Sequence, residues 1–239
     1  MNSSPAETYL GRRLSASQLS MLRAIDSCTV ANAIEFAGIR LRNTGYMSSA
    51  VACVFPEKVP LVGHAFTLVV KTSDPPLKGF SYIDRTDWWD QLLSIPEPRV
   101  LVAEDREAHA GTGSLLGEVH ANVYKALGCA GMITNGAVRD LPALGKMSFQ
   151  VFASHVSVSH AYAHIVEVGK PVTVGGLEVR TGDLIHGDMH GVISIPWQCI
   201  SQLPVLAAQQ KQREKIIIDY CKSAERTVEG LRRILLGKS

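Results

Sequence analysis

The sequence is most informative at Gly113-Ser114-Leu115-Leu116-Gly117-Glu118 and, one helix length later, at Asn135-Gly136-Ala137-Val138-Arg139-Asp140. The first segment predicts a glycine-bearing helix start, and the second places a fixed cation beside a carboxylate after a strand. Unpaired N–H groups at a helix N-terminus and an arginine fork both bind carboxylates. An aspartate beside them can hold a hard divalent cation that keeps water ligands. Together these parts predict a site for a small oxo-acid bound to a metal.

The chain around these segments has the pattern strand, loop, helix, strand, turn. Residues 99–103 are an apolar run typical of a buried strand, and 104–112 are polar and glycine-containing, as in a loop. From Ser114, apolar residues recur every four positions to Leu127, which predicts a helix capped by Ser114 and ended by Gly128. Residues 131–134 predict a second strand, and Asn135-Gly136 a tight turn.

Four stretches of this chain resemble one known family. They are GEVHANVYKALGCAGMITNGAVRD (117–140), QVFASHVSVS (150–159), PVTVGGLEVRTGDLIHGD (171–188) and GVISIP (191–196). The chain is similar from about residue 27 to 196 to the RraA-like family. That family includes 4-hydroxy-4-methyl-2-oxoglutarate aldolases, which also decarboxylate oxaloacetate, and a regulator of ribonuclease E. The resemblance implies an α/β fold, a swivelling β/β/α domain, assembled as a trimer or hexamer with sites at subunit interfaces.

The resemblance also implies roles for individual residues. Arg139 and the backbone amides of Gly117, Glu118, Val119 and His120 would bind the substrate carboxylate, and Asp140 would hold Mg²⁺ or Mn²⁺. Glu118 is at the position where family enzymes place an acid that orients a metal-bound water for proton transfer. The alternative for Glu118 is an acid that only complements the helix dipole.

Two positions distinguish an enzyme from a regulator within this resemblance. The ribonuclease regulator lacks an acid after the arginine, whereas Asp140 is present here. Family enzymes usually carry another acid three positions later, where this chain has Ala143. Loss of an outer-shell partner typically lowers metal affinity ~10–100-fold. We favour the enzyme; the alternative is a non-catalytic binding protein that regulates an RNA-processing enzyme.

Lysine placement favours metal-assisted chemistry over a Schiff base. A Schiff-base aldolase needs a lysine in the pocket, but Lys125 falls on the predicted helix and Lys146 beyond the predicted turn. A bound cation would stabilise a pyruvate enolate as a C–C bond breaks. Retro-aldol cleavage and oxaloacetate decarboxylation share that enolate. The expected activity is therefore that of a class II pyruvate aldolase or oxaloacetate decarboxylase acting on a small 2-oxo acid.

Composition agrees with this expectation. The 239 residues carry a net charge of +2, which does not favour a nucleic-acid or membrane surface, and no apolar run approaches a membrane span. Five cysteines without a C-x-x-C spacing predict buried free thiols in a reducing compartment, hence the cytoplasm. We expect a flexible lead at 1–14, a catalytic domain at 15–200 and a helical segment at 201–239. This last segment would pack on the domain or on a neighbouring subunit, with a kink near Pro204.

Three further patterns have alternative explanations. Gly111-x-Gly113-x-x-x-Gly117 hints at a dinucleotide-binding turn, but the following strand lacks the acid that would contact a ribose. His186-x-Asp188-x-His190 has zinc-ligand types, although Gly187 and Gly191 suggest a turn. Glu214 is the nearest candidate for the acid that family enzymes supply from a neighbouring subunit; the alternative is a solvated helix face.

Overall fold

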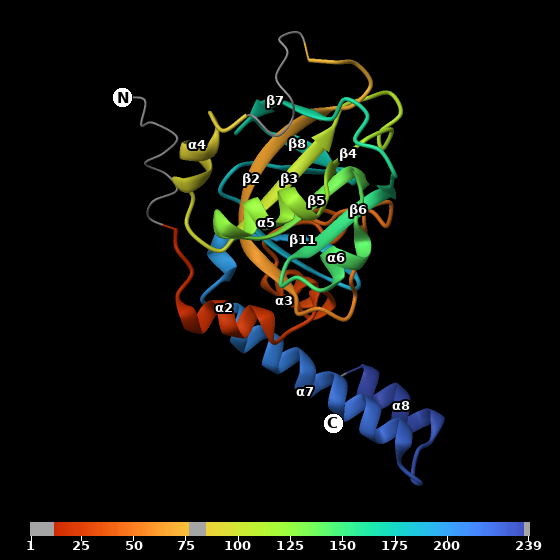
Figure 1. Cartoon of the computed structure of the whole chain (residues 1–239). Coiled ribbons are helices and arrows are strands. Elements are labelled where there is room, and N and C mark those ends of the chain that lie inside the picture. Colours follow the sequence, from red (N-terminus) through yellow and green to blue (C-terminus); the bar gives the residue numbers. More distant parts are fainter. Residues whose placement is uncertain (1–11, 77–84, 237–239) are drawn as a thin grey trace.

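The computed structural model describes residues 12–76 and 85–236, so most of the predicted lead lies outside it. The sequence also predicts a loop at 71–89, of which 77–84 lie outside the described residues. The centre of the fold is a mixed nine-stranded sheet with the order β1-β6-β5-β3-β2-β10-β11, in which β4 also pairs with β5 and β7 with β2 (Figure 1). The strands are β1 (Ala52–Cys53), β2 (Leu61–Lys71), β3 (Arg99–Asp105), β4 (Ser114–Leu116), β5 (Cys129–Val138), β6 (Gln150–Val156), β7 (His164–Val168), β10 (Leu184–Asp188) and β11 (Gly191–Ile195). A separate hairpin joins β8 (Val172–Val174) to β9 (Leu177–Val179). The expected α/β class is confirmed.

The helices pack on this sheet and extend beyond it. They are α2 (Ala16–Arg23), α3 (Ser27–Ala37), α4 (Trp89–Leu93), α5 (Glu118–Ala126), α6 (Leu141–Gly145), α7 (Leu203–Lys222) and α8 (Val228–Leu235). The α7 helix leads away from the body of the molecule and α8 folds back along it (Figure 1). The predicted C-terminal helical extension is therefore present. Among the described residues no helix has the length and apolar character needed to cross a membrane.

The parallel strands β2, β3, β5 and β6 form the buried centre of the fold. Side chains on a strand alternate between its two faces. Accordingly, Leu101 and Ala103 of β3 pack in the apolar cluster that includes Tyr124 of α5, whereas Val100 and Val102 pack in the cluster under the β8–β9 hairpin. Burial on both faces explains why β3 has an unbroken apolar run at 100–103 and why ten consecutive residues of β2 are buried. The sheet therefore gives α5 and the strand ends a rigid support.

Local sequence signals explain several element boundaries. Ser15 and Gln18 form a capping box at α2. Asp26 caps α3 by accepting from the Thr29 N–H at 2.7 Å, and Gly38 ends it with a φ of 65°. Pro204 lies in the first turn of α7, where a missing N–H breaks no helical bond. The predicted kink is therefore wrong, because the proline starts the helix.

Other predictions were wrong around the informative segments. Ser114 does not cap a helix: it opens β4, and Gly117 is the N-cap of α5. Asn135-Gly136 is not a tight turn, because β5 continues to Val138 with a register irregularity between Thr134 and Ala137. The Asn135 side chain explains the irregularity: its amide oxygen accepts from the Asp105 N–H at 2.7 Å and its amide nitrogen donates to the Asp105 carbonyl at 2.9 Å.

The cysteines test the expectation of buried free thiols, and Trp88 tests whether the Trp88-Trp89 pair of the sequence belongs to a loop over a site or to ordinary packing. All five thiols are free, but only Cys129 and Cys199 are buried, whereas Cys28 and Cys221 are exposed. The expectation of uniformly buried thiols is therefore wrong, since these two lie on outward helix faces. Trp88 is 2 % exposed and stacks on Phe66 with ring centroids 5.8 Å apart. It is a core residue.

Candidate functional site

The predicted site residues meet where β4 and β5 end. The two strands are parallel, with Leu116 opposite Val138. The Arg139 N–H donates to the Leu116 carbonyl at 2.9 Å, which extends this pairing by one step. Because the carboxyl ends of parallel strands share one edge of a sheet, Gly117 at the start of α5 lies beside Arg139 and Asp140. The sequence separation of the two motifs therefore becomes a direct contact.

Asp140 connects the two motifs. One carboxylate oxygen, Oδ2, accepts from the Glu118 backbone N–H at 3.0 Å, and Oδ1 accepts from Arg139 Nε at 3.2 Å. A Cβ on Gly117 would lie 2.5 Å from that Oδ2 atom, so only glycine leaves room for the carboxylate. Asp140 also has a left-handed backbone, with a φ of 56°, and is the N-cap of the short helix α6.

Electrostatics keep this carboxylate ionised. The hydrogen bond from the Glu118 N–H is the largest cause that lowers the pKa of Asp140, and the Arg139 guanidinium adds to it. His160 lowers the pKa of Asp140 further through its charge. The side chains of Arg139 and Asp140 are 30 % and 36 % exposed. The arrangement therefore offers a permanent cation and an anionic oxygen donor to a ligand from solvent.

The structure brings Gly117, Glu118, Arg139 and Asp140 together. Val119 and His120 follow in the first turn of α5; Val119 is 63 % exposed, whereas His120 is buried and its ring lies 5.6 Å from that of Tyr124. The hydrogen bond of one predicted substrate-binding amide differs from the expectation. The Glu118 amide, expected among the donors to a substrate carboxylate, donates to Asp140 instead.

The structure shows the contacts of two further candidate positions, Ala143 and Glu214. Ala143 is on α6, and its N–H donates to the Asp140 carbonyl at 3.0 Å. Its side chain brings no second carboxylate. Glu214 of α7 is engaged within its own chain, where its Oε1 accepts from Gln210 at 3.0 Å and from Asn32 of α3 at 3.4 Å.

Sequence reasoning missed two residues next to the site. Asp105 is buried at the end of β3, and its carboxylate accepts from the Gly111 N–H at 2.8 Å and the Glu107 N–H at 3.1 Å. It thereby folds the 105–111 loop beside the site. His160 Nδ1 donates to the Ser114 carbonyl at 3.1 Å and holds the following loop on β4. The two acids Glu104 and Asp105, which follow the predicted strand 99–103, were a signal for Asp105. For His160 the sequence suggested only an ordinary hydrogen-bonded histidine, with no role at the site.

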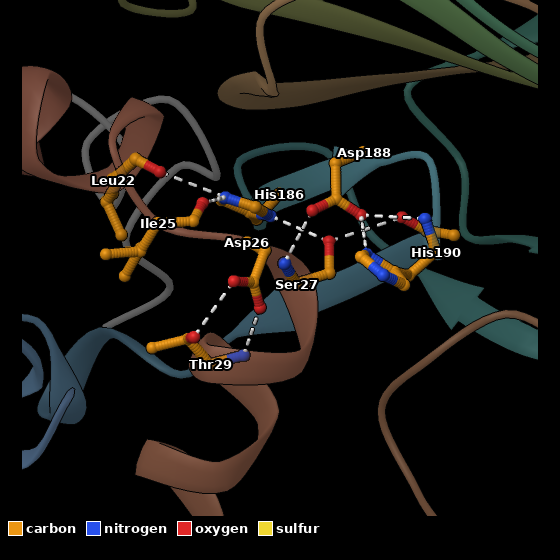
Figure 2. Close-up of polar contacts among 9 residues, drawn as sticks. Leu22, Ile25, Asp26, Ser27, Thr29, His186, Asp188 and His190 are labelled. Atoms are coloured by element: carbon orange, nitrogen blue, oxygen red, sulfur yellow. Dashed lines mark hydrogen bonds and ion pairs between the residues drawn. The ribbon is translucent and has the colours of Figure 1, made fainter. Parts of the chain in front are cut away.

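The His186-x-Asp188-x-His190 pattern is structural (Figure 2). His186 is fully buried; its Nε2 donates to the carbonyls of Leu22 at 3.0 Å and Ile25 at 3.1 Å, and its Nδ1 accepts from the Ser27 hydroxyl at 3.0 Å. Burial lowers the pKa of His186, which keeps the ring neutral. Asp188 accepts from the backbone N–H groups of Ser27 at 2.8 Å and His190 at 2.9 Å. This network joins α3 to the β10–β11 turn.

Residues 12–76 and 85–236 contain no group of three or more His, Cys, Asp or Glu side chains placed to hold a metal ion.

The glycine pattern around Gly111 and Gly113 also has a packing explanation. A Cβ on Gly111 would lie 2.5 Å from the His155 ring, and one on Gly113 would lie 2.3 Å from the His160 carbonyl oxygen. These glycines allow close approach of a crossing loop, and α5 begins only after β4.

The fold and site define a class: a mixed α/β domain whose sheet edge presents a glycine-led helix start, an arginine and an ionised aspartate. A family model described as "RraA-like: Aldolase/RraA" matches residues 27–194. The chain belongs to the RraA-like family.

Similar proteins agree with this assignment. A Halalkalibacterium halodurans protein named "Putative 4-hydroxy-4-methyl-2-oxoglutarate aldolase" is 34 % identical over 86 residues, which are 36 % of this chain and 41 % of that protein. The match thus spans less than half of that relative's length. Two solved structures share the fold: an uncharacterized Pseudomonas syringae protein (TM-score 0.69, 22 % identity, 92 % of this chain and 95 % of that chain) and Streptomyces coelicolor RraAS2 (0.66, 22 %, 85 % and 98 %). The latter is described as an unusual member of the RNase ES inhibitor RraA protein family.

Proposed function

We propose that this protein is a divalent-metal-dependent lyase that cleaves a C–C bond of a 4-hydroxy- or 4-carboxy-2-oxo acid to give pyruvate. The observation that carries the proposal is the Gly117–Arg139–Asp140 contact, in which a cation and an ionised carboxylate share one exposed edge. The aldolase name of a family relative supports the same reaction class.

The donor set at Asp140 fits Mg²⁺ or Mn²⁺. Mg²⁺ usually takes one or two protein carboxylates and keeps several waters. Asp140 is such a carboxylate: two protein hydrogen bonds leave acceptor positions open, and its low pKa keeps it anionic. The absence of a three-ligand cluster in the described chain agrees with a water-rich site and disfavours a zinc-type cage. When bound, the cation supplies positive charge that stabilises the pyruvate enolate.

The chain's own residues would position the substrate and move a proton. Arg139 donates to Asp140 through Nε, and the two terminal nitrogens of its guanidinium carry further N–H groups that can bind the substrate carboxylate. Glu118 is exposed in the first turn of α5, where the helix dipole favours its anion. From there it can accept, through a water, the proton that leaves the 4-hydroxyl group as the C–C bond breaks, and return it to the enolate carbon; in a decarboxylation that proton would come from solvent water. These roles need no lysine nucleophile.

The same proposal includes a homo-oligomer, a trimer or hexamer, that covers this open edge. Exposed apolar side chains surround it: Val119 on α5 is 63 % exposed, Val156 at the end of β6 is 64 % exposed, and Val158 in the next loop is 93 % exposed. Val156 is opposite Val138, the residue before Arg139. Apolar groups gathered beside a polar site are typical of a surface that a protein partner covers.

A second candidate function is a binding protein that regulates an RNA-processing enzyme. Ala143 favours it, because no second acid supports Asp140 from α6. The Streptomyces protein, described as a member of a ribonuclease inhibitor family, has the same fold.

One experiment separates these functions. Purified protein with Mg²⁺ or Mn²⁺ is assayed for pyruvate release from oxaloacetate and from 4-hydroxy-4-methyl-2-oxoglutarate, with and without a chelator, beside the Asp140→Asn variant. We expect chelator-sensitive pyruvate release that Asp140→Asn abolishes, together with a fall in metal affinity by calorimetry. If neither substrate gives metal-dependent pyruvate, the binding protein is favoured, and a pull-down partner should then bind regardless of chelator.

A further inference from the structure

A cavity of about 490 Å³ lies at the opposite end of the parallel strands from Asp140. It is bounded by the end of α2, by residues 57–60 and the start of β2, by the start of β5, and by the end of α6, the 146–149 loop and the start of β6. This volume is in the range of small-molecule sites. It is separate from the candidate active site, since neither Arg139 nor Asp140 lines it.

Positive charge dominates the lining of this cavity. The described lining residues include three cations, Arg23, Lys58 and Lys146, against one carboxylate, Glu57. None of these cations has a carboxylate within ion-pair distance in the part of the chain that the structure describes. The lining therefore carries an excess of two positive charges.

Lys58 is held in a fixed position at this cavity. Its Nζ donates to the Leu144 carbonyl at 2.7 Å and to the Phe149 carbonyl at 3.0 Å, and it lies 4.0 Å from the Phe55 ring centroid. An ammonium has three donors, so one remains after these two bonds. Burial lowers the pKa of Lys58, and a bound anion would favour its charged form. The flexible cations Arg23 and Lys146 are exposed at the rim.

The rest of the lining is a mixture of apolar and polar residues. Its apolar surface comes from Val59, which is 71 % exposed, and from the partly exposed Pro60, Ala130 and Met147, whereas Leu61 and Phe149 are almost fully buried. Sites that bind small organic molecules combine such apolar surface with a few placed charges. An inorganic anion would contact only the cations and would leave the apolar surface of the lining hydrated.

We propose that this cavity binds a small organic anion, with Lys58, Lys146 and Arg23 contacting its charged group and the apolar lining contacting its body. The proposal is independent of the reaction catalysed at Asp140. Because Lys58 holds the last turn of α6 through the Leu144 carbonyl, ligand binding should be visible in the backbone resonances of residues 141–149.

The test uses phenyl phosphate as the probe, with phenol and inorganic phosphate as its separated parts. Calorimetry measures binding to the unaltered 239-residue chain and to its Arg23→Met/Lys146→Met variant. Lys58 is left intact because it holds two backbone carbonyls. The matched control is Lys170→Met/Lys222→Met, which removes the same charge at two other exposed lysines. Arg139→Met excludes the candidate active site as the place of binding.

We expect one phenyl phosphate per chain, bound more tightly than phenol or phosphate. Arg23→Met/Lys146→Met should weaken it by about tenfold or more, because two charge-assisted contacts are lost. The control pair and Arg139→Met should bind as the wild type does. Three results would overturn the proposal: no binding of phenyl phosphate, unchanged binding by the Arg23/Lys146 pair, or loss of binding in Arg139→Met. Phenol binding as tightly as phenyl phosphate would overturn the requirement for an anion.

Discussion

Replacing Gly117 by alanine should inactivate the protein while leaving it folded. The added Cβ would lie 2.5 Å from Asp140 Oδ2 and 3.1 Å from Arg139 Cγ. Ordinary contact needs about 3.5 Å, so the carboxylate must move by roughly 1 Å and lose its bond from the Glu118 N–H. A misplacement of about 1 Å in a catalytic constellation costs on the order of 100-fold in rate. We therefore expect kcat/KM to fall about 100-fold.

The effect on stability should be small. Asp140 is partly exposed, so loss of its hydrogen bond costs about 1 kcal/mol, which lowers Tm by about 2–4 °C for a chain of this size. Gly176→Ala is the matched control. Gly176 has a φ of 79° with open space around it, and forcing alanine into this left-handed conformation costs a similar ~1–2 kcal/mol far from Asp140.

The assay is metal-dependent pyruvate release, beside thermal unfolding and metal titration of both variants. Gly176→Ala should lose stability and keep its activity, whereas Gly117→Ala should lose activity and metal affinity together. Wild-type kcat/KM in Gly117→Ala would refute the reasoning, because it would show that the position of Asp140 does not limit the reaction.

Three other predictions concern single side chains. Arg139→Lys should lower kcat/KM by about 100-fold or more, because lysine cannot make a bidentate carboxylate contact worth roughly 2–4 kcal/mol; steady-state kinetics within threefold of wild type would contradict this. His64 is buried against Trp197, and burial lowers its pKa to about 4. Its contribution to the free energy of unfolding is therefore full above the unfolded-state pKa of about 6.5. Between pH 6.5 and pH 4 the free energy of unfolding falls by up to about 1.4 kcal/mol per pH unit, because the unfolded chain binds the proton more tightly. Urea unfolding at pH 7.5 and 5 should show a smaller loss in His64→Phe, and equal losses would rule out His64 as the cause. Glu214→Gln should assemble and turn over within about twofold of wild type, because Glu214 is engaged by Asn32 and Gln210 of its own chain; sedimentation and activity measure both, and a large loss of activity alone would place Glu214 in a neighbouring site.

The sequence predicted those parts of the fold that depend on local patterns. The sequence predicts a helix that opens at Ser27 and stops at Gly38, and α3 covers Ser27–Ala37 with Gly38 as its left-handed exit. Its N-cap is the adjacent residue Asp26, which the pattern did not assign. The sequence also predicts a hairpin at 172–179 with a two-glycine turn, and β8 and β9 are joined by Gly175 and Gly176, both with positive φ. Arg139 and Asp140 were predicted beside Gly117 from the order strand, loop, helix, strand, turn, which brings a helix start and the residues after the next strand to one edge of a sheet.

The parts of the fold that the sequence did not predict depend on pairing between segments that are distant in the sequence. The three residues of β4 are too few to show a period, and only their alignment with β5 makes them a strand. The Asn135-Gly136 pair has the composition of a turn, but two side-chain bonds to the Asp105 backbone keep β5 extended. Tertiary contacts decided both cases.

The left-handed backbone at Asp140 has a consequence for how this protein can diverge. Apart from glycine, asparagine and aspartate are the residues that visit this conformation most readily. Aspartate codons reach both asparagine and glycine codons by a single base change. Loss of the carboxylate is therefore an easily reached mutation that leaves the backbone unstrained. Descendants of such a chain can keep the whole architecture without the carboxylate, so the proposed metal-dependent role has to be judged at this one side chain.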